Sequence, residues 1–224
     1  MSQLFDNWPD PYEAWFQTPI GKQVKATELD LVLELVEPST GDKVLDAGCG
    51  SGIFTEPLVE QGASIVGLDI SLPMLSRARN RLPNEAFLAA DICALPFPDN
   101  CFDKAVSITA LEFIEDGEQA IAELFRVTRP GGRVVVATLN NLSPWATRRK
   151  KDAEKDSSSI FNDAWFRSPD ELLALTSVPG QTCTAVHFTK DCDPAEAAQI
   201  EHQGLINRLD TGAFLIGGWT KPRG

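Results

Sequence analysis

One short stretch of the sequence has the residue types of a ligand-binding turn. An apolar run ends at Asp46, and Gly48, Gly50 and Gly52 follow at every second position. Residues 53–59 then have the apolar spacing of a helix. A strand, a glycine turn and a helix let a ligand lie on backbone amides at a helix N-terminus, with no Cβ in its way. The stretch therefore predicts the main ligand site of the chain.

The glycine spacing alone leaves the ligand open, because nicotinamide and flavin dinucleotide binders use a similar turn. Their fingerprint, G-x-G-x-x-G, places its last glycine three residues after the second. Here Gly52 comes two residues after Gly50, and a dinucleotide gives no reason for the acid at Asp46. A ligand that has its own cation near the turn explains that acid.

Two further acids follow predicted strands. Asp69 ends the second apolar run, where a carboxylate can accept hydrogen bonds from both hydroxyls of a ribose. The alternative role for Asp69, an N-cap of the next helix, suits Ser71 better. Asp91 and Ile92 follow the run 86–90 and suit adenine, with the acid at its exocyclic amine and the apolar side chain on its ring face. For Asp91, an acid in a surface loop is the alternative.

Strands and helices are predicted to alternate along the chain. The predicted strands are 44–46, 63–68, 86–90, 102–108, 133–139, 182–188 and 212–219, and the predicted helices are 20–36, 53–59, 72–81, 118–128, 169–175 and 194–209. This alternation requires a mainly parallel sheet with helices on both faces, and right-handed crossovers place the carboxyl ends of the strands at one edge. Asp46, Asp69, Asp91 and Thr109 all lie at that edge, where open α/β sheets bind ligands.

Composition restricts the function classes. The chain has 224 residues, of which 43% are hydrophobic, and this predicts one globular domain. Its formal net charge of −12 argues against a nucleic-acid partner, because phosphate binding needs clustered lysine and arginine. The main basic run, 148–151, is followed by acids and is interpreted as a solvated loop. No apolar run reaches the roughly 20 residues of a membrane span, and residues 1–6 lack the features of a signal peptide, so a cytoplasmic location is expected.

The cysteines do not predict a metal site. They are odd in number, form no CxxC pair and have no histidine near them in the sequence; their positions are 49, 93, 101, 183 and 192. This spacing supports neither a zinc site nor a disulfide framework, and we expect no metal.

Two segments outside the glycine-turn region are predicted to cover the site. Residues 1–40 form an N-terminal helical and aromatic cap segment, and residues 41–224 form the ligand-binding domain. The aromatic residues of 1–18 either pack on the body of the domain or act as a lid over the glycine turn. Residues 140–167, approximately, have little apolar periodicity and are interpreted as a lid-like insertion above the same edge.

Several motifs in combination resemble the class I S-adenosylmethionine-dependent methyltransferases. They are V-L-D-A-G-C-G-S-G at 44–52, the acid Asp69, A-D at 90–91, F-D-x-A at 102–105 and R-P-G-G at 129–132. The most similar subset is the small-molecule type that includes the ubiquinone/menaquinone-biosynthesis methyltransferases. The resemblance implies an α/β, Rossmann-like three-layer sandwich with a mostly parallel seven-stranded sheet whose last strand is antiparallel. Residues 41–224 would then be the S-adenosylmethionine-binding methyltransferase domain.

The resemblance also implies the cofactor, S-adenosyl-L-methionine, with S-adenosyl-L-homocysteine as its product. The glycine turn would hold the methionine part, with Asp46 near its amino group, and Asp69 would hold the ribose. Asp91 and Ile92 would flank adenine, with Met74 packed on the ring, and residues 109–111 would form the floor near the sulfonium. The implied cofactor-binding residues are Asp46, Ala47, Gly48, Cys49, Gly50, Gly52, Asp69, Ile70, Met74, Asp91, Ile92, Thr109, Ala110 and Leu111.

The acceptor site is predicted only by residue type. Many relatives carry A-L-E-H where this chain ends the motif with Phe113, so a histidine role there cannot be carried over. His187 lies in a predicted strand and His202 in a predicted helix; both are interpreted as structural, and no catalytic base is named. The predicted substrate-pocket residues are Tyr12, Trp15, Phe113 and Trp145, with Trp8, Trp165 and Phe166 as further aromatic candidates.

The resulting hypothesis is methyl transfer from S-adenosylmethionine to a small, apolar or aromatic acceptor by in-line displacement. The sulfonium charge already activates the methyl group, so the protein has to align the reactants and exclude water. A small-molecule partner and a monomer or homodimer are expected. Two alternatives stay open: a non-catalytic S-adenosylmethionine-binding regulatory protein, and a dinucleotide-dependent oxidoreductase of the same fold.

Overall fold

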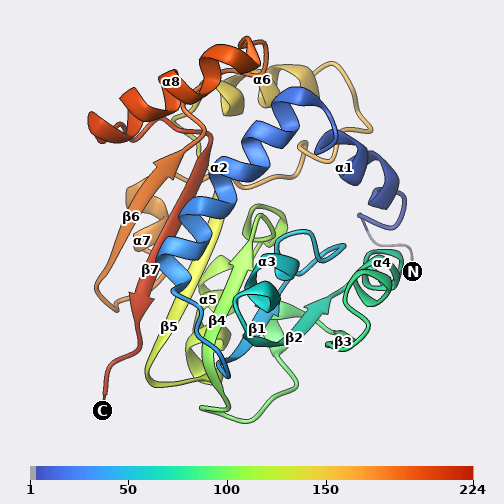
Figure 1. The fold of residues 1–224 in the computed structure, drawn as a ribbon, viewed down its shortest axis with the longest axis vertical. Coiled ribbons are helices and arrows are strands. Elements are labelled where there is room, and N and C mark those ends of the chain that lie inside the picture. Colours follow the sequence, from blue (N-terminus) through green and yellow to red (C-terminus); the bar gives the residue numbers. More distant parts are fainter. Residues whose placement is uncertain (1–3, 224) are drawn as a thin grey trace.

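The computed structural model describes residues 4–223, which form a seven-stranded sheet (Figure 1). The strands are β1 (Lys43–Ala47), β2 (Ser64–Asp69), β3 (Ala86–Ala89), β4 (Phe102–Ile108), β5 (Thr128–Leu139), β6 (Gly180–Ala185) and β7 (Phe214–Thr220). Their spatial order is β3-β2-β1-β4-β5-β7-β6. β7 is antiparallel to both of its neighbours, whereas the other pairs are parallel. The predicted sheet with an antiparallel last strand is confirmed.

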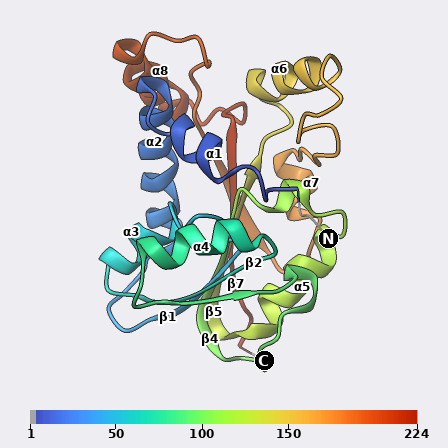
Figure 2. The ribbon, with the colours of Figure 1, turned by 90° about the vertical axis from the view of Figure 1, so that its right-hand side faces the viewer.

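Helices cover both faces of this sheet (Figure 2). The helical elements are α1 (Pro9–Trp15), α2 (Pro19–Val36), α3 (Thr55–Glu60), α4 (Leu72–Arg81), η1 (Ile92–Ala94), η2 (Leu111–Phe113), α5 (Gly117–Val127), α6 (Pro144–Ala153), α7 (Pro169–Leu173) and α8 (Pro194–Ile206). On one face, α2, α3 and α8 enclose an apolar cluster around Val36 and Ile65. On the other, α5 and α7 pack over Leu45 and Val136. Within the described residues, no helix combines the length and hydropathy that crossing a bilayer requires.

Serine caps begin several of the helices. The predicted N-cap of α4 is present, because the Ser71 hydroxyl accepts from the backbone N–H of Met74 at 3.4 Å. α7 begins with a capping box: the Ser168 hydroxyl accepts from the N–H of Glu171 at 3.3 Å, and the Glu171 carboxylate accepts from the N–H of Ser168 at 2.7 Å. α6 begins with a serine N-cap, because the Ser143 hydroxyl accepts from the N–H of Ala146 at 3.0 Å. Low apolar periodicity hides this helix in the sequence, although a serine followed by proline is the same start signal.

β5 begins earlier than its apolar run predicts. Thr128 pairs with Phe102, and the register then shifts so that Arg133 pairs with Lys104. The R-P-G-G segment at 129–132 therefore forms a bulge within the strand, which bends the chain without ending the pairing. The bulge lies at the amino end of β5, away from the edge where the predicted ligand residues gather.

The carboxyl ends of β1, β2 and β4 meet at one edge of the sheet. The register places Asp46 beside Gly67 of β2 and Val106 of β4, and Asp69 is the last residue of β2. Thr109 directly follows β4. Figures 1 and 2 both show α1 and α6 above this edge. The fold therefore brings an N-terminal segment and a distant internal helix over the predicted site.

Candidate active site

A cavity of about 900 Å³ opens at the carboxyl edge of the sheet, a volume that is typical of small-molecule sites. The predicted cofactor-binding residues in its wall are Asp46, Gly48, Cys49, Gly50, Asp69, Ile70, Met74, Asp91, Ile92, Thr109 and Ala110. The other three predicted cofactor-binding residues do not line the cavity and are buried in the protein; they are Ala47, Gly52 and Leu111. The wall includes all four predicted acceptor residues, Tyr12, Trp15, Phe113 and Trp145. Of the further aromatic candidates, it includes Trp8 but not Trp165 or Phe166.

The turn after β1 has backbone angles that favour glycine. The φ angles are +80° at Gly48, +52° at Gly50 and +80° at Gly52. The backbone N–H of Gly48 donates to the carbonyl of Leu68 at 2.7 Å, which holds the turn against β2. A Cβ on Gly48 would lie 2.4 Å from the Cβ of Ala110, whereas a Cβ on Gly50 would meet no heavy atom within 4 Å. Gly50 therefore borders open space at the turn.

Asp46 is a buried acid with one unused oxygen. The residue is 1% exposed, and its Oδ2 accepts from the hydroxyl of Thr55 at 2.6 Å. Its Oδ1 is buried and has no hydrogen-bond partner within the described chain. Burial raises the pKa of Asp46 to about 6, although the bond from Thr55 opposes the rise. An unsatisfied buried acceptor is destabilising, so a hydrogen-bond donor at Oδ1 would stabilise the site.

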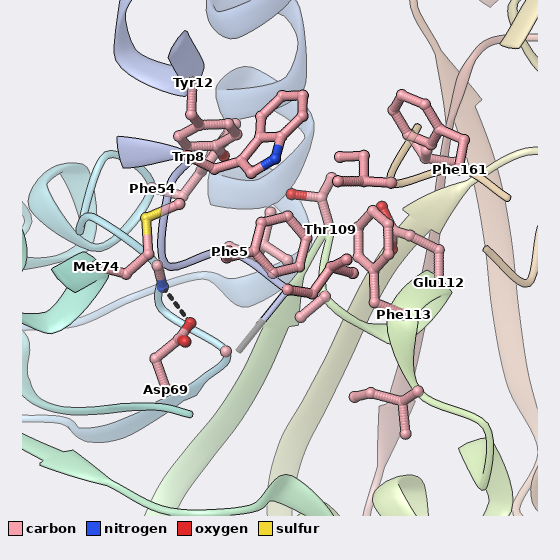
Figure 3. Close-up of a pocket in the computed structure, with 18 of the residues that line it drawn as sticks. Phe5, Trp8, Tyr12, Phe54, Asp69, Met74, Thr109, Glu112, Phe113 and Phe161 are labelled. Carbon is pink, nitrogen blue, oxygen red and sulfur yellow. Dashed lines mark hydrogen bonds between the residues drawn. The ribbon is translucent and has the colours of Figure 1, made fainter. Parts of the chain in front are cut away.

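Asp69 fastens the glycine turn to the end of β2. Its Oδ2 accepts from the N–H of Gly50 at 2.9 Å, the dashed line in Figure 3, and its Oδ1 accepts from the N–H of Ser71 at 2.8 Å. Burial raises the pKa of Asp69, and these hydrogen bonds act in the opposite direction. The carboxylate thus positions the turn while it forms part of the cavity wall.

The residues predicted to surround adenine differ in burial. Met74 is 3% exposed and Ile92 6% exposed, whereas Ile70 is 49% exposed. Asp91 is exposed, and its Oδ1 accepts from the N–H of Cys93 at 2.8 Å, which caps η1. Asp91 therefore acts as a loop cap and also contributes to the cavity wall.

Aromatic rings form the opposite part of the wall (Figure 3). Phe5 meets Phe113 edge to face with 4.8 Å between ring centroids, and Phe161 lies 6.2 Å from Phe113. Trp15 meets Trp145 of α6 with a centroid distance of 6.2 Å. The N-terminal aromatic residues thus pack on the domain and form part of the cavity wall, and their action as a lid stays a prediction.

Three ionisable side chains of the wall are not singled out by the sequence. Glu28 and Glu112 are 8% and 1% exposed, and burial raises their pKa values to about 8 and about 7. Arg149 belongs to the basic run, and the predicted solvated loop there is wrong: the run lies in α6, and burial lowers the pKa of this guanidinium. Glu28 lies on the buried stripe of α2 between Val24 and Leu31, where an acidic side chain is unusual.

The two histidines are outside the cavity wall. His187 has its Nδ1 3.2 Å from Oε1 of Glu201, and its backbone N–H donates to Oε2 of the same carboxylate at 2.7 Å. The hydrogen bond to Glu201 raises the pKa of His187. His202 is exposed on α8. These contacts agree with structural roles. In residues 4–223, no cluster of His, Cys, Asp and Glu side chains has the arrangement of a metal site.

Comparison with known proteins assigns the family. A family model described as a methyltransferase domain matches residues 45–136. A demethylmenaquinone methyltransferase of Renibacterium salmoninarum is 40% identical over 111 residues, which are 50% of this chain and 47% of that protein. A malonyl-[acyl-carrier protein] O-methyltransferase of Pseudescherichia vulneris is 32% identical over 215 residues, which are 87% of this chain and 86% of that protein. The chain belongs to the S-adenosylmethionine-dependent methyltransferases.

The fold of this methyltransferase is also that of solved members. A possible histamine N-methyltransferase from Thermotoga maritima superposes with a TM-score of 0.77 and 24% identity, over 97% of this chain and 98% of that chain. The match to the demethylmenaquinone methyltransferase, by contrast, spans about half the length of either protein. The methyltransferase is an enzyme that uses S-adenosylmethionine. The relatives described here support neither of the alternatives, the non-catalytic regulator and the dinucleotide-dependent oxidoreductase.

Proposed function

We propose that this methyltransferase moves the methyl group of S-adenosylmethionine to a small, flat, apolar or aromatic acceptor bound in the same cavity. The observation that carries the proposal is the composition of that cavity. An acid-and-glycine half at the ends of β1 and β2 continues into an aromatic half under α1 and α6. The first half suits the cofactor and the second suits the acceptor.

The residues of the strand-edge half fit the chemistry of S-adenosylmethionine. The unpartnered Oδ1 of Asp46 offers an acceptor for the α-amino group, and the open space at Gly50 leaves room for the methionine chain beside the turn. The carboxylate of Asp69 can accept from the ribose hydroxyls. Met74 and Ile92 offer buried apolar side chains for the faces of adenine.

The aromatic half has the task of alignment. When bound, the cofactor supplies a methyl group that its sulfonium charge already activates. Trp15, Phe113 and Trp145 then have to hold a flat acceptor in line with the methyl–sulfur bond and keep water out.

The names of the relatives indicate two chemical classes of methyl acceptor and do not decide between them. They are named for demethylmenaquinone and for malonyl-[acyl-carrier protein], which differ in chemistry. Rings that line the wall, such as Trp8, Tyr12 and Phe161, favour a flat ring system over a short acyl chain, because aromatic pairs gain from edge and stacking contacts.

Calorimetric titration with S-adenosylhomocysteine tests the cofactor half. Asp69→Ala should weaken binding about tenfold or more, because it removes a charged hydrogen-bond acceptor for the ribose and the anchor of Gly50. Asp30→Ala is the matched control, since Asp30 is an exposed acid of α2, and it should bind like the wild type. Release of S-adenosylhomocysteine during incubation with flat phenols and quinols then measures transfer.

Two results would oppose the proposal. Equal affinities of the wild type and Asp69→Ala would remove the ribose role from Asp69. A wild type that binds neither S-adenosylmethionine nor S-adenosylhomocysteine would remove the cofactor from this cavity.

A further inference from the structure

The acceptor half contains charged side chains that an apolar pocket does not need. Glu28 comes from α2, Glu112 from η2 and Arg149 from α6, and all three line the cavity. Both acids are almost fully buried. Burying charges is unfavourable unless partners or ligands satisfy them. The presence of three ionisable side chains from three elements in one cavity wall therefore suggests a function for them.

Arg149 has donor capacity that the described residues leave unused. Its guanidinium lies over Trp145 at 5.2 Å and over Phe161 at 5.4 Å from the ring centroids. Its Nη1 is buried and has no hydrogen-bond partner within residues 4–223. Arg167 is the other arginine whose charge lowers the pKa of Glu112, and its guanidinium donates to the carbonyl of Leu111 at 3.0 Å. Aromatic rings therefore position Arg149, and its Nη1 can still donate a hydrogen bond to a ligand.

The acids face Arg149 without touching it. Their charges influence its pKa, yet none of the ion pairs in the described part of the chain joins Arg149 to Glu28 or to Glu112. A gap therefore separates the partly buried Arg149, whose Nη1 is fully buried, from two buried carboxyl groups of the cavity wall. A group that accepts from an arginine and donates to a carboxylate fits such a gap, and a hydroxyl does both.

Glu112 is the acid that is best held for proton transfer. The hydroxyl of Thr138 donates to its Oε2 at 3.2 Å, and its backbone carbonyl accepts from the N–H of Trp165 at 2.7 Å. Burial raises its pKa to about 7, and Arg149 and Arg167 oppose the rise. A carboxylate with a pKa near neutrality matches the requirement for a general base.

We propose, on the basis of the function proposed above, that Arg149, Glu112 and Glu28 form a subsite for the acidic hydroxyl of a phenol or enol acceptor. Arg149 Nη1 donates to the acceptor oxygen, and the Glu112 carboxylate takes the hydroxyl proton. Glu28, whose burial raises its pKa to about 8, is protonated at neutral pH and adds no second negative charge. An aryl amine suits this subsite less well than a phenol, because its nitrogen lone pair is delocalised into the ring and accepts weakly from Arg149, and its N–H is far less acidic than a phenolic O–H.

The transfer step balances within the site. The proton of the acceptor hydroxyl moves to Glu112, and a lone pair of the resulting oxyanion forms the new bond to the methyl carbon. The methyl–sulfur bond breaks at the same time, and its electron pair stays on sulfur as neutral S-adenosylhomocysteine. Glu112 then returns its proton to solvent when the ether product leaves. Arg149 stabilises the oxygen while its negative charge develops.

Three naphthalenes that differ in one substituent test the subsite. Protein loaded with S-adenosylhomocysteine is titrated with 2-naphthol, 2-methoxynaphthalene and 2-naphthylamine, and fluorescence reports binding. The wild type should bind the naphthol about tenfold more tightly than the methyl ether, because only the naphthol can both donate and accept. Arg149→Met should remove this preference. Lys151→Met, an exposed cation of the same helix, should retain it.

The pH profile of methyl transfer to 2-naphthol tests the role of Glu112. In the wild type the rate should rise with pH as Glu112 loses its proton. The charged and titratable groups that face Glu112 are Tyr12, Glu28, Arg149 and Arg167. Glu112→Gln can still accept from Thr138 and should bind S-adenosylhomocysteine normally. It should nevertheless lose this rise and react about a hundredfold more slowly. Glu118→Gln, an exposed acid of α5, should behave like the wild type.

The outcomes separate the subsite from the underlying function. Equal affinities for the three naphthalenes, no binding of any of them, faster methylation of the amine, or an unchanged preference in Arg149→Met would overturn the subsite. If S-adenosylhomocysteine still binds in those cases, the proposed function stands and only the hydroxyl acceptor is wrong. A wild type that fails to bind S-adenosylhomocysteine would overturn both proposals.

Discussion

Gly50 and Gly41 share a left-handed backbone but differ in what surrounds them. Their φ angles are +52° and +88°, and a Cβ on either would meet no heavy atom within 4 Å. Only Gly50 borders the cavity. An alanine is strained by the left-handed φ at either position, so a loss of ligand affinity confined to the Gly50 variant would come from contact between its methyl group and the ligand.

We therefore expect Gly50→Ala and Gly41→Ala to lose similar stability, about 1 kcal/mol each, in chemical unfolding. Gly50→Ala should in addition weaken S-adenosylhomocysteine binding about tenfold, because its methyl group would occupy space beside the turn. Calorimetry on both variants measures this. Equal affinities for the two variants would show that the ligand does not approach Gly50.

For single residues, the sequence predicts the positions of those that directly follow or end a strand. Asp46 and Asp69 end strands, so their meeting at one edge follows from the alternation of strands and helices. The environment of Arg149 does not follow, because it depends on α6 crossing above the sheet and on Phe161 packing beside it. A run of four basic residues alone cannot show which one turns inwards.

Among the elements, α1 is tied to α4 by charged contacts. Asp10 pairs with Arg77, and Glu13 pairs with Arg81 at 2.8 Å. Asp6, which precedes α1, accepts from the hydroxyl of Ser71 at 2.9 Å. α4 follows Asp69, so these contacts hold the aromatic N-terminal segment over the proposed cofactor half.

Removing two of these contacts should loosen the N-terminal segment. In Asp10→Asn/Glu13→Gln we expect S-adenosylhomocysteine to dissociate about five to tenfold faster, because an exposed ion pair contributes about 0.2–1 kcal/mol. In the wild type, added salt should have a similar effect through screening. Stopped-flow tryptophan fluorescence measures the rate. Asp99→Asn removes a comparable pair with Arg126 away from the cavity and should leave the rate unchanged; a rate that also stays unchanged in the double variant would mean that α1 does not retain the cofactor.

The elements themselves are largely predictable where apolar periodicity is strong. The predicted helix 72–81 and strand 102–108 have the observed bounds. The start of β5 differs from the predicted residue 133, because Thr128, which precedes the bulge, already pairs with Phe102 of β4. α6 differs because its neighbours, not its own pattern, stabilise it: Trp145 donates from Nε1 to the carbonyl of Phe188 at 2.7 Å.

For the whole molecule, the buried acids set how stability depends on pH. Burial raises the pKa values of Asp46, Glu112 and Glu28 to about 6, 7 and 8. A carboxyl group whose pKa is raised on folding holds its proton in the folded state after the unfolded chain has released it. Its contribution to stability is therefore greatest below its ordinary pKa and is lost as the pH rises through the raised value. His187, whose pKa Glu201 also raises, changes in the same direction.

The free energy of unfolding without cofactor should therefore fall between about pH 5 and pH 8. Asp42 and Glu123, whose pKa values hydrogen bonds lower, lose their contribution only at more acidic pH and do not cancel this trend. Glu28→Gln cannot ionise, so its stability should fall less steeply over the same interval. Urea unfolding at several pH values measures the slope, with the exposed Glu118→Gln as the control that should follow the wild type. A wild type whose stability is constant or rises across this interval, or a Glu28→Gln variant with the wild-type slope, would show that solvent reaches these acids and that burial in the cavity does not govern their protonation.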